Sequence, residues 1–458
     1  MISMRSARAQ AARALFVGMG AAALAFGSPP AASAQAFGPA AGAVAAEVAR
    51  ADAPREVRDF YRARGGRPLW VRDGQVGPEA EALLDLVASA ELDGLDPDDY
   101  RPRQLVAALR RAGDGSPRSL ARAEVAMSRA FAELARDMRS PREVGVHYAD
   151  AELAPKPVAM RAMLEQAAAA PSLQAHVDGL RWMHPIYAQL RRAAAEQAAG
   201  ADQSAIDLIR ANLDRARVLP GAAQPGRYVV VDAAAARLWM YEDGRAAGTM
   251  KVVVGKPEEP TPMMAGLIRY ASVNPYWNLP PDLARLRVAP GALKQGPAFL
   301  RAKRFEVLSG WEADAKVVDP ATIDWAAVQA GRIEARVRQL PGPANAMGRI
   351  KYMFPNKFGV YLHDTPEKAL MREDDRLFSS GCVRLEDAPR LGRWLFGKPV
   401  PLKTSTPEKR VDLGSPVPVY ITYLTVAADG GEMVFRPDVY GRDKVQVAGG
   451  DAGRFASR

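Results

Sequence analysis

Two residues of this chain have the side chains and the setting that nucleophilic catalysis needs. Cys382 is the single cysteine among 458 residues, and it lies in the segment 378–385 (FSSGCVRL). A cysteine attacks as its thiolate, which a nearby base or the N–H groups at a helix start can favour. His363 is the candidate base, because it ends a predicted strand over residues 358–363, nineteen positions before the cysteine. The residues themselves also allow a buried, unreactive thiol and a surface or capping histidine.

The neighbours of both residues favour the catalytic interpretation. Side chains alternate along a strand, so Tyr361 and His363 share one face while the residues between and before them pack in the core. Gly381 lets a substrate approach the backbone closely, so its N–H and that of Cys382 are candidates to bind a developing oxyanion. A predicted helix begins near Ala388. We expect Cys382 on the loop that enters this helix, whose positive end would modestly favour a thiolate.

Other sequence signals of chemistry are weak. The remaining histidines, His147, His176 and His184, lie in the helical half, and we assign them a surface or capping role. The acid-rich segment 93–99 has neither a glycine nor a final glutamate at the positions that a calcium loop needs, so helix capping and solvation explain it better. Neither a zinc-protease motif nor a phosphate-binding loop is present, and one cysteine cannot form a disulfide or a multi-cysteine metal cage. We therefore expect no metal and no cofactor.

The spacing of apolar residues divides the chain at residues 219–226, where two prolines and two glycines interrupt any helix. Before this linker, apolar residues recur at helical spacing, which predicts helices over 78–92, 120–134 and 204–218. After it, alternating β-rich runs predict strands over 228–231, 237–241, 250–254, 268–273, 358–363, 417–426 and 432–436.

These patterns predict an α+β protein with two main domains. We expect a helical domain over residues 35–218 and a mainly β catalytic domain over 226–443, followed by a tail over 444–458. The pattern turns helical and irregular again inside the second domain. This change predicts a helical insertion over residues 282–350.

Composition and the N-terminus point to an exported globular protein. With 48% apolar and 25% charged residues, the chain has an ordinary globular composition. Three arginines and a short apolar run precede the triplet at 32–34 (ASA), which predicts a signal peptide over residues 1–34. The apolar run is shorter than a membrane-spanning helix usually is, so we expect no stable membrane span once the signal peptide is cleaved. The net charge of +10 includes no basic block interleaved with aromatic residues, which argues against nucleic acid as a partner.

Together these features resemble the YkuD-type L,D-transpeptidases, in particular their large periplasmic members. The combination of His363 with Cys382 inside Ser-x-Gly-Cys-Val-Arg is similar to the signature of their catalytic domain. The resemblance extends to further segments of both halves. They are 254–257 (VGKP) with 261–262 (TP), 274–281 (NPYWNLPP) and 361–366 (YLHDTP) in the second half, and 68–70 (PLW) and 93–100 (DGLDPDDY) in the helical half.

The resemblance implies a cysteine acyltransferase of peptidoglycan. Cys382 would attack the carbonyl of meso-diaminopimelate, the third residue of a tetrapeptide stem, and release the terminal D-alanine. A diaminopimelate amine of a neighbouring stem would then take the acyl group, which gives a 3→3 cross-link. His363 would take the thiol proton, protonate the departing amine and deprotonate the acceptor amine. Since the family usually orients this histidine by a backbone carbonyl, Asp364 receives no catalytic role.

The resemblance also implies supporting roles. Arg384 would hold the catalytic loop or, alternatively, bind a substrate carboxylate. Tyr361, Ser379 and Ser380 would shape the substrate pocket. The insertion over 282–350 resembles a capping subdomain, which acts as a lid over the donor stem. Tetrapeptide stems and proteins of cell-wall synthesis are the expected partners, and the periplasm is the expected location.

Two other functions stay open at this point. The same residues could pass the acyl group to water, which would make the protein an L,D-carboxypeptidase or a peptidoglycan hydrolase. A non-catalytic wall-binding scaffold with a structural cysteine is the third interpretation. It predicts a thiol that is inert to alkylation and to carbapenems, whereas both enzymes predict a covalent adduct that disappears in Cys382→Ala.

Overall fold

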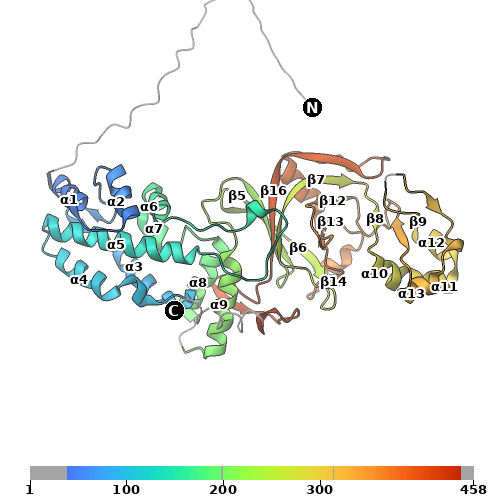
Figure 1. Ribbon diagram of the computed structural model, residues 1–458, viewed down its shortest axis with the longest axis horizontal. Coiled ribbons are helices and arrows are strands. Elements are labelled where there is room, and N and C mark those ends of the chain that lie inside the picture. The colour runs from blue at the N-terminus through green and yellow to red at the C-terminus, as the bar shows by residue number, and fades with distance from the viewer. Residues whose placement is uncertain (1–38, 198–199, 313, 445–458) are drawn as a thin grey trace, which may run out of the picture.

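The computed structural model describes residues 39–197, 200–312 and 314–444. Figure 1 shows three parts in a row: a helical part, a central β part, and a smaller part inserted into the β part. This arrangement confirms the predicted fold class. The predicted signal peptide, and all but the first residue of the predicted tail, lie outside the described residues. Within the described ranges, every helix is too short or too polar to cross a membrane.

The helical part is built around α5, which the helical spacing of its apolar residues predicts. α5 starts after Ser116, whose hydroxyl accepts a hydrogen bond from the Ser119 N–H at 3.2 Å, and it buries Leu120, Phe131 and Leu134. The helices of this part are α1 (Pro39–Arg50), α2 (Arg55–Ala63), α3 (Glu79–Ala88), α4 (Pro102–Ala112), α5 (Pro117–Met138), α6 (Met160–Ala169), α7 (Leu173–Asp178), α8 (Pro185–Gln197) and α9 (Gln203–Arg217).

The β part is a closed ring of strands. The strands follow the order β12-β13-β15-β6-β5-β4-β16-β7, and β7 pairs in turn with β12. Valines of several strands, such as Val229 on β4 and Val252 on β6, are fully buried in its core. The strands are β3 (His147–Tyr148), β4 (Arg227–Asp232), β5 (Arg237–Glu242), β6 (Arg245–Gly255), β7 (Met264–Val273), β12 (Ile350–Met353), β13 (Leu362–His363), β14 (Leu377–Ser379), β15 (Val383–Leu385) and β16 (Lys409–Thr422).

The predicted strand over residues 358–363 is wrong for all but its last two residues, which form β13. The side chain of Asn356 accepts hydrogen bonds from the N–H groups of Phe358 at 3.0 Å and Val360 at 3.2 Å. Gly359 has a φ of +63°, which glycine adopts without strain. A compact loop therefore precedes His363, and it brings the Gly359 carbonyl to Cys382.

The expected position of Cys382 on a loop entering a helix is also wrong. The strand β15 follows the cysteine directly, and the helix α14 (Ala388–Phe396) begins only after Asp387, whose carboxylate caps it. The field of a helix end fades within one turn. The end of α14 therefore does not lower the pKa of the thiol.

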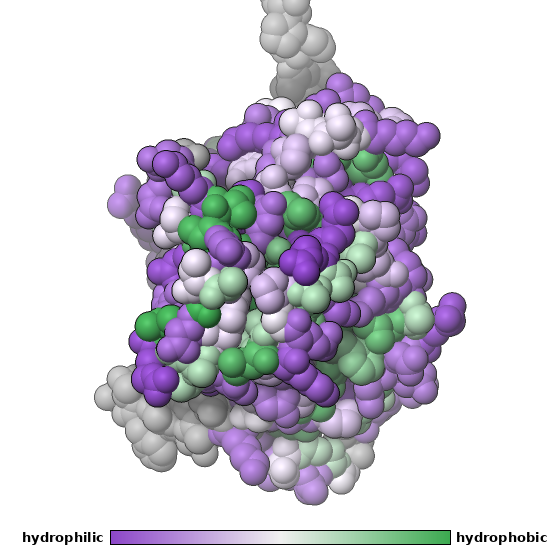
Figure 2. All heavy atoms as spheres, turned by 90° about the vertical axis from the view of Figure 1, so that its right-hand side faces the viewer, coloured by the Kyte–Doolittle hydropathy of each residue, from purple (hydrophilic) through white to green (hydrophobic). Residues whose placement is uncertain are grey.

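The insertion contains the predicted helices and, in addition, a sheet in the order β10-β9-β11-β8. It has its own core, in which Leu279, Val307 and Val337 are buried. Figure 2 shows its outer end, where hydrophobic residues lie as separate areas among hydrophilic ones. The elements are β8 (Trp277–Asn278), α10 (Pro281–Leu283), the π-helix η4 (Ala284–Val288), α11 (Ala289–Gln295), α12 (Pro297–Lys303), β9 (Phe305–Leu308), β10 (Val317–Val318), α13 (Trp325–Gln329) and β11 (Arg336–Gln339).

The helical part and the β part exchange segments. The strand β3 leaves the helical part and pairs with β7. In the other direction, β17 (Val426–Asp429) and β18 (Glu432–Phe435) form a hairpin that packs on α8. We call the contact of α8 and α9 with residues 423–443 the junction. The linker at 219–226 thus separates the two parts along the chain, while their cores are shared.

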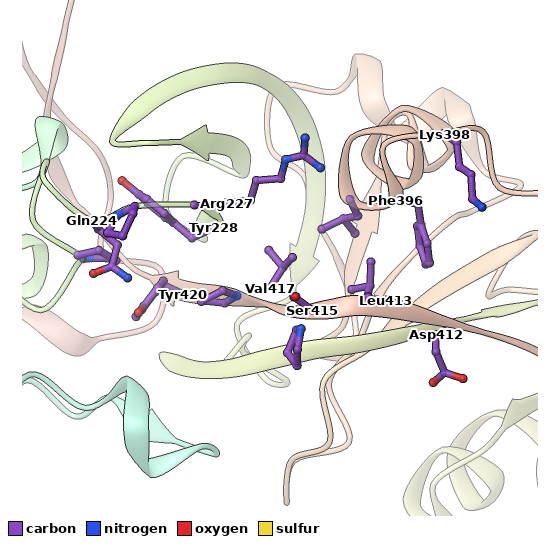
Figure 3. Close-up of a pocket in the computed structure, with 17 residues that line it drawn as sticks. Gln224, Arg227, Tyr228, Phe396, Lys398, Asp412, Leu413, Ser415, Val417 and Tyr420 are labelled. Carbon is purple, nitrogen blue, oxygen red and sulfur yellow. The ribbon is translucent and has the colours of Figure 1, made fainter. Parts of the chain in front are cut away.

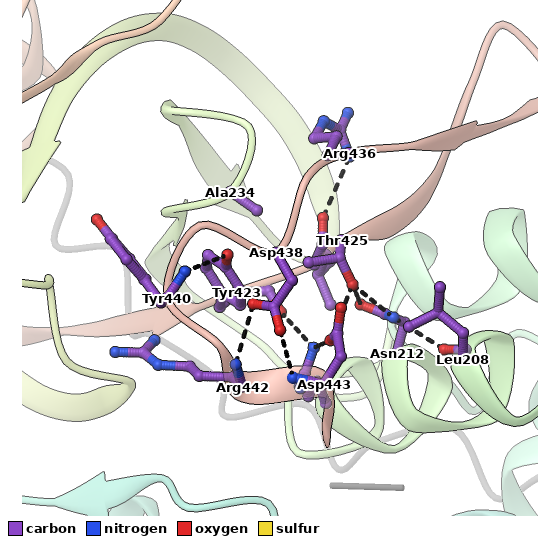
Figure 4. A network of polar contacts seen from close by, with 12 residues as sticks. Leu208, Asn212, Ala234, Tyr423, Thr425, Arg436, Asp438, Tyr440, Arg442 and Asp443 are labelled. Atoms are coloured by element: carbon purple, nitrogen blue, oxygen red, sulfur yellow. Dashed lines mark hydrogen bonds and ion pairs between the residues drawn. The ribbon is translucent and has the colours of Figure 1, made fainter. Parts of the chain in front are cut away.

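The junction is held by buried polar contacts (Figure 4). Asn212 on α9 donates a hydrogen bond to the Thr425 hydroxyl at 3.0 Å. Arg215, whose side chain is 1% exposed, forms an ion pair with Asp443 at 2.6 Å, and Thr425 also donates to this carboxylate. The last described residues are therefore part of the domain interface.

Candidate active site

The strand register places the predicted nucleophile and base on one face of the sheet. β13 and β15 are parallel, with Leu362 beside Val383 and His363 beside Arg384. Leu362 and Val383 are fully buried in the core. Because side chains alternate, Cys382, one step before Val383, shares the opposite face with His363 and Arg384. The structure thus brings together residues that lie nineteen positions apart.

The ring of His363 is fixed by a backbone carbonyl. Its Nδ1 lies 2.6 Å from the carbonyl oxygen of Asp364. A carbonyl only accepts hydrogen bonds, so Nδ1 carries the proton and Nε2 is left as the basic atom. The Asp364 carboxylate is used elsewhere, since it accepts from Lys368 at 2.8 Å and from the Arg349 N–H at 3.0 Å. It is not hydrogen-bonded to the imidazole.

The imidazole is neutral at rest. Burial lowers the pKa of His363 to about 3, and the positive charge of Arg384 acts in the same direction. A buried cation would lose its hydration, which disfavours the protonated ring. Nε2 of His363 is therefore unprotonated at neutral pH.

The thiol of Cys382 is protonated at rest. Its Sγ lies 3.7 Å from the carbonyl oxygen of Gly359, to which it donates. Burial raises the pKa of Cys382, while a backbone hydrogen bond to Tyr361 and the charges of Arg384 and Lys351 oppose this shift. Among the described residues, no hydrogen bond joins Sγ to His363. The resting pair is thus a thiol and an imidazole, rather than an ion pair.

The backbone around Gly381 is tied down by its neighbours. Gly381 has a φ of +97°, and its carbonyl accepts a hydrogen bond from the Thr261 hydroxyl at 2.9 Å. The Ser379 hydroxyl donates to the carbonyl of Cys382 at 2.5 Å, so this buried serine supports the loop. Within the described chain, the N–H groups of Gly381 and Cys382 have no hydrogen-bond partner. Sequence reasoning quoted Thr261 only as part of a resemblance and missed its contact with the loop.

The remaining predicted residues lie around this centre. Arg384 forms an ion pair with Glu367 and is mostly buried, which fits support of the loop. The ring of Tyr361 lies 5.7 Å from Nζ of Lys351, a buried cation that sequence reasoning missed. Ser380 accepts a hydrogen bond from Arg287 of the insertion at 2.6 Å. Nothing in the local sequence pattern links Arg287 to the catalytic loop, because 93 residues separate it from Ser380.

The other histidines lie outside this centre. His184 caps α8, because its Nδ1 accepts a hydrogen bond from the Ile186 N–H at 3.1 Å. His176 is buried, so the predicted surface or capping role is wrong for it. His147 is half-buried, and its ring packs edge-on against Phe358 at 5.1 Å between centroids.

A cavity of about 650 Å³ lies at a different place (Figure 3). It is lined by the linker, by the start of β4, by the end of α14 and by β16, including Arg227, Phe396 and Val417. None of the predicted site residues lines it. The cavity is therefore separate from Cys382.

Comparisons with known proteins identify both main parts. The Scaffold domain family matches residues 55–193, and the YkuD L,D-transpeptidase catalytic domain matches residues 226–419. A Haemophilus influenzae protein named "Putative L,D-transpeptidase" is 31% identical over 240 residues, which are 51% of this chain and 47% of that protein. The chain thus spans about half the length of this curated relative.

Two solved structures show weak similarity. "Structure of the Ldtfm-avibactam carbamoyl enzyme" matches with a TM-score of 0.21 and 16% identity, over 43% of this chain and 49% of that chain. "L,D-transpeptidase from Mycobacterium smegmatis" matches with a TM-score of 0.22 and 14% identity, over 43% of this chain and 58% of that chain. Similarity at this level supports no further conclusion.

Proposed function

The chain belongs to the YkuD family of L,D-transpeptidases, and from this premise we propose that it is a cysteine acyltransferase that forms 3→3 cross-links in periplasmic peptidoglycan. One observation carries the proposal. His363 has Nδ1 engaged by a backbone carbonyl and Nε2 free, on the sheet face that it shares with Cys382. A neutral base beside a thiol is the arrangement that nucleophilic catalysis by cysteine requires.

Acylation begins from the neutral pair. When a tetrapeptide stem binds, the thiol leaves the Gly359 carbonyl and passes its proton to Nε2 of His363. Sγ of Cys382 then attacks the carbonyl of the third stem residue. The free N–H groups of Gly381 and Cys382 can stabilise the oxyanion that forms. The imidazolium gives its proton to the amine of D-alanine, the C–N bond breaks, and a thioester remains.

Deacylation reverses these roles. The side-chain amine of diaminopimelate on a second stem attacks the thioester while His363 takes its proton. The C–S bond breaks, the sulfur recovers the proton from the imidazolium, and an amide joins the two stems. The free thiol and the neutral imidazole are restored, so no cofactor is consumed.

Intact-protein mass spectrometry tests this proposal. With a carbapenem, and then with disaccharide-tetrapeptide, the full chain should gain a covalent adduct that is absent in Cys382→Ala. In His363→Ala, acylation near neutral pH should fall by about 10²–10⁴-fold, as is typical when a general base is lost. A chain that forms no adduct with either compound would contradict the proposal and favour a non-catalytic scaffold.

The products decide between transfer and hydrolysis. Incubation with tetrapeptide stems should yield cross-linked dimers of 3→3 type. Tripeptide monomers alone would instead identify an L,D-carboxypeptidase. Cleavage of a cross-linked muropeptide, supplied in a separate incubation, would identify a hydrolase.

The pH dependence of alkylation tests the neutral resting pair. Because burial raises the pKa of Cys382, the rate with iodoacetamide should keep rising as the pH is increased from 7 to 9. A rate that is already constant from pH 6 would show a thiolate–imidazolium pair and contradict this state. Denatured protein provides the reference for an unperturbed thiol.

A further inference from the structure

Four polar residues from three separate segments meet beside the nucleophile. Arg287 on η4 of the insertion donates from Nη2 to the Ser380 hydroxyl at 2.6 Å, two residues before Cys382. The same nitrogen lies 3.8 Å from Oε2 of Glu259. Oε1 of Glu259 lies 3.7 Å from Nζ of Lys256. We call Arg287, Glu259, Lys256 and Ser380 the polar cluster.

The polar cluster lies directly against the catalytic loop. The N–H of Lys256 donates to the Ser379 carbonyl at 3.0 Å. The carbonyl oxygens of Pro260 and Glu259 lie 3.7 Å and 3.9 Å from the position that a Cβ on Gly381 would take. The turn that carries Glu259 is therefore in contact with the glycine before the nucleophile.

The charges of the cluster are only loosely paired. Both ion-pair distances exceed the usual length of a charge-assisted hydrogen bond. Oε2 of Glu259 is buried and has no hydrogen-bond partner among the described residues. A buried carboxylate oxygen without a partner is costly, and such groups are rare in folded proteins. The cluster thus has one acceptor and two cations that can engage a ligand.

We propose that the polar cluster binds the zwitterionic amino-acid head of the donor's third stem residue, with its carboxylate on Arg287 and its ammonium on Glu259. This inference rests on the proposed function, which places the carbonyl of that residue at Cys382. The side chain of diaminopimelate begins at the carbon next to this carbonyl and ends in an ammonium and a carboxylate on one carbon. A guanidinium binds a carboxylate bidentately, and the unpartnered oxygen of Glu259 accepts from an ammonium.

Arg287 also couples donor binding to the position of the insertion. Arg287 belongs to the insertion, whereas Glu259 and Ser380 belong to the β part. A head group that bridges Arg287 and Glu259 therefore holds the insertion against the catalytic loop. Binding of the correct donor and closure of the lid become one event.

Two donor stems test separately the contact of the carboxylate with Arg287 and that of the ammonium with Glu259. A stem with lysine at the third position keeps the ammonium and lacks the carboxylate. In the wild-type chain, kcat/KM for acylation should be higher for the diaminopimelate stem by about tenfold or more, because one charge-assisted contact is lost with lysine. Arg287→Ala should reduce this ratio to about one by slowing the diaminopimelate stem alone. Glu259→Gln should slow both stems about equally and keep the ratio.

Controls distinguish recognition from a structural role. Arg285→Ala removes the same charge from the same π-helix and should keep the wild-type ratio, and Arg287→Lys should restore part of it. If Arg287 only supported the fold, Arg287→Ala would slow both stems alike, which would overturn the inference. Equal kcat/KM values for the two stems in the wild-type chain would overturn the inference as well.

Carbapenem acylation separates this inference from the proposed function. A carbapenem lacks the amino-acid head, so its reaction with the wild-type chain tests Cys382 and His363 without the contacts to that head. A carbapenem adduct in the wild-type chain, together with loss of the stem preference in Arg287→Ala, supports the inference. Absence of carbapenem and stem adducts in the wild-type chain would instead show that the proposed function fails.

Discussion

The helical part and the insertion are attached to the β part in different ways. At the junction, Leu424 and Val426 of the C-terminal segment are buried in the core of the helical part. The insertion instead has a core of its own, and it reaches the catalytic loop through the exposed contact of Arg287 with Ser380. One connection thus joins two cores, and the other joins two surfaces.

We expect the two connections to have different roles, the junction in stability and the contact of the insertion in substrate recognition. The junction buries Arg215 with its partner Asp443, so the loss of either residue should disturb the folded state. The side chain of Arg287 is 39% exposed, and water competes for its contacts. We therefore expect the junction to determine the free energy of unfolding, and the contact of the insertion to determine which donor reacts.

The largest effect is expected from Asp443→Ala. This change leaves the buried guanidinium of Arg215 without its carboxylate, which should lower the free energy of unfolding by about 3–5 kcal/mol. Urea unfolding measures this loss. Arg215→Met combined with Asp443→Ala should recover part of it, because no unpaired charge remains. A loss below about 1 kcal/mol would show that the junction is not a major source of stability.

A pair of core truncations tests the separation of the two cores. Leu424→Ala should cost about 3 kcal/mol, because a buried leucine leaves a cavity in the shared core. Hydrogen exchange should then increase in both the helical and the β part. Val337→Ala in the core of the insertion should increase exchange only over about residues 282–350. If both variants increased hydrogen exchange in the same residues, the two cores would not be separate.

Sequence reasoning predicted what depends on local pattern. The spacing of apolar residues identifies α5 and α9, and alternation identifies β4 and β5. The residue types of His363 and Cys382, one at the end of a predicted strand and the other after a glycine, predicted a shared site. The register of β13 and β15 places both residues on one face of the sheet. These features need only nearby residues.

The failures depend on contacts between distant residues. Asn356 organises the loop at 358–361 by its side chain, and strand propensity gives no sign of this. The polar cluster requires Arg287 to reach Ser380 across 93 residues. The shared junction requires Leu424 to pack among helices of the other half. No pattern along the chain encodes such pairings.

Acid should weaken the contact between the start of α8 and the β part, where the ring of His184 lies 4.8 Å from that of Tyr241 between centroids. Burial lowers the pKa of His184 to about 3, below its unfolded value of about 6.5. The unfolded chain therefore binds a proton first as the pH falls below 6.5, and stability declines from there toward pH 3. At pH 5 the loss due to His184 should be about 2 kcal/mol. In His184→Gln, the difference in unfolding free energy between pH 7 and pH 5 should shrink by this amount; an unchanged difference would contradict the assignment.

The smallest effect on stability is expected from Arg287→Ala. Exposed ion pairs contribute little because water solvates both charges, so the free energy of unfolding should change by less than about 0.5 kcal/mol. The same variant should lose its preference between donor stems, which a stability effect of this size cannot explain. Asp443→Ala provides the opposite case, since it should lower stability and leave the donor preference unchanged in the folded fraction. If Arg287→Ala lowered the free energy of unfolding as much as Asp443→Ala, the contact of the insertion would support the fold as the junction does. Loss of the donor preference could then result from unfolding and would no longer support a role of Arg287 in donor recognition.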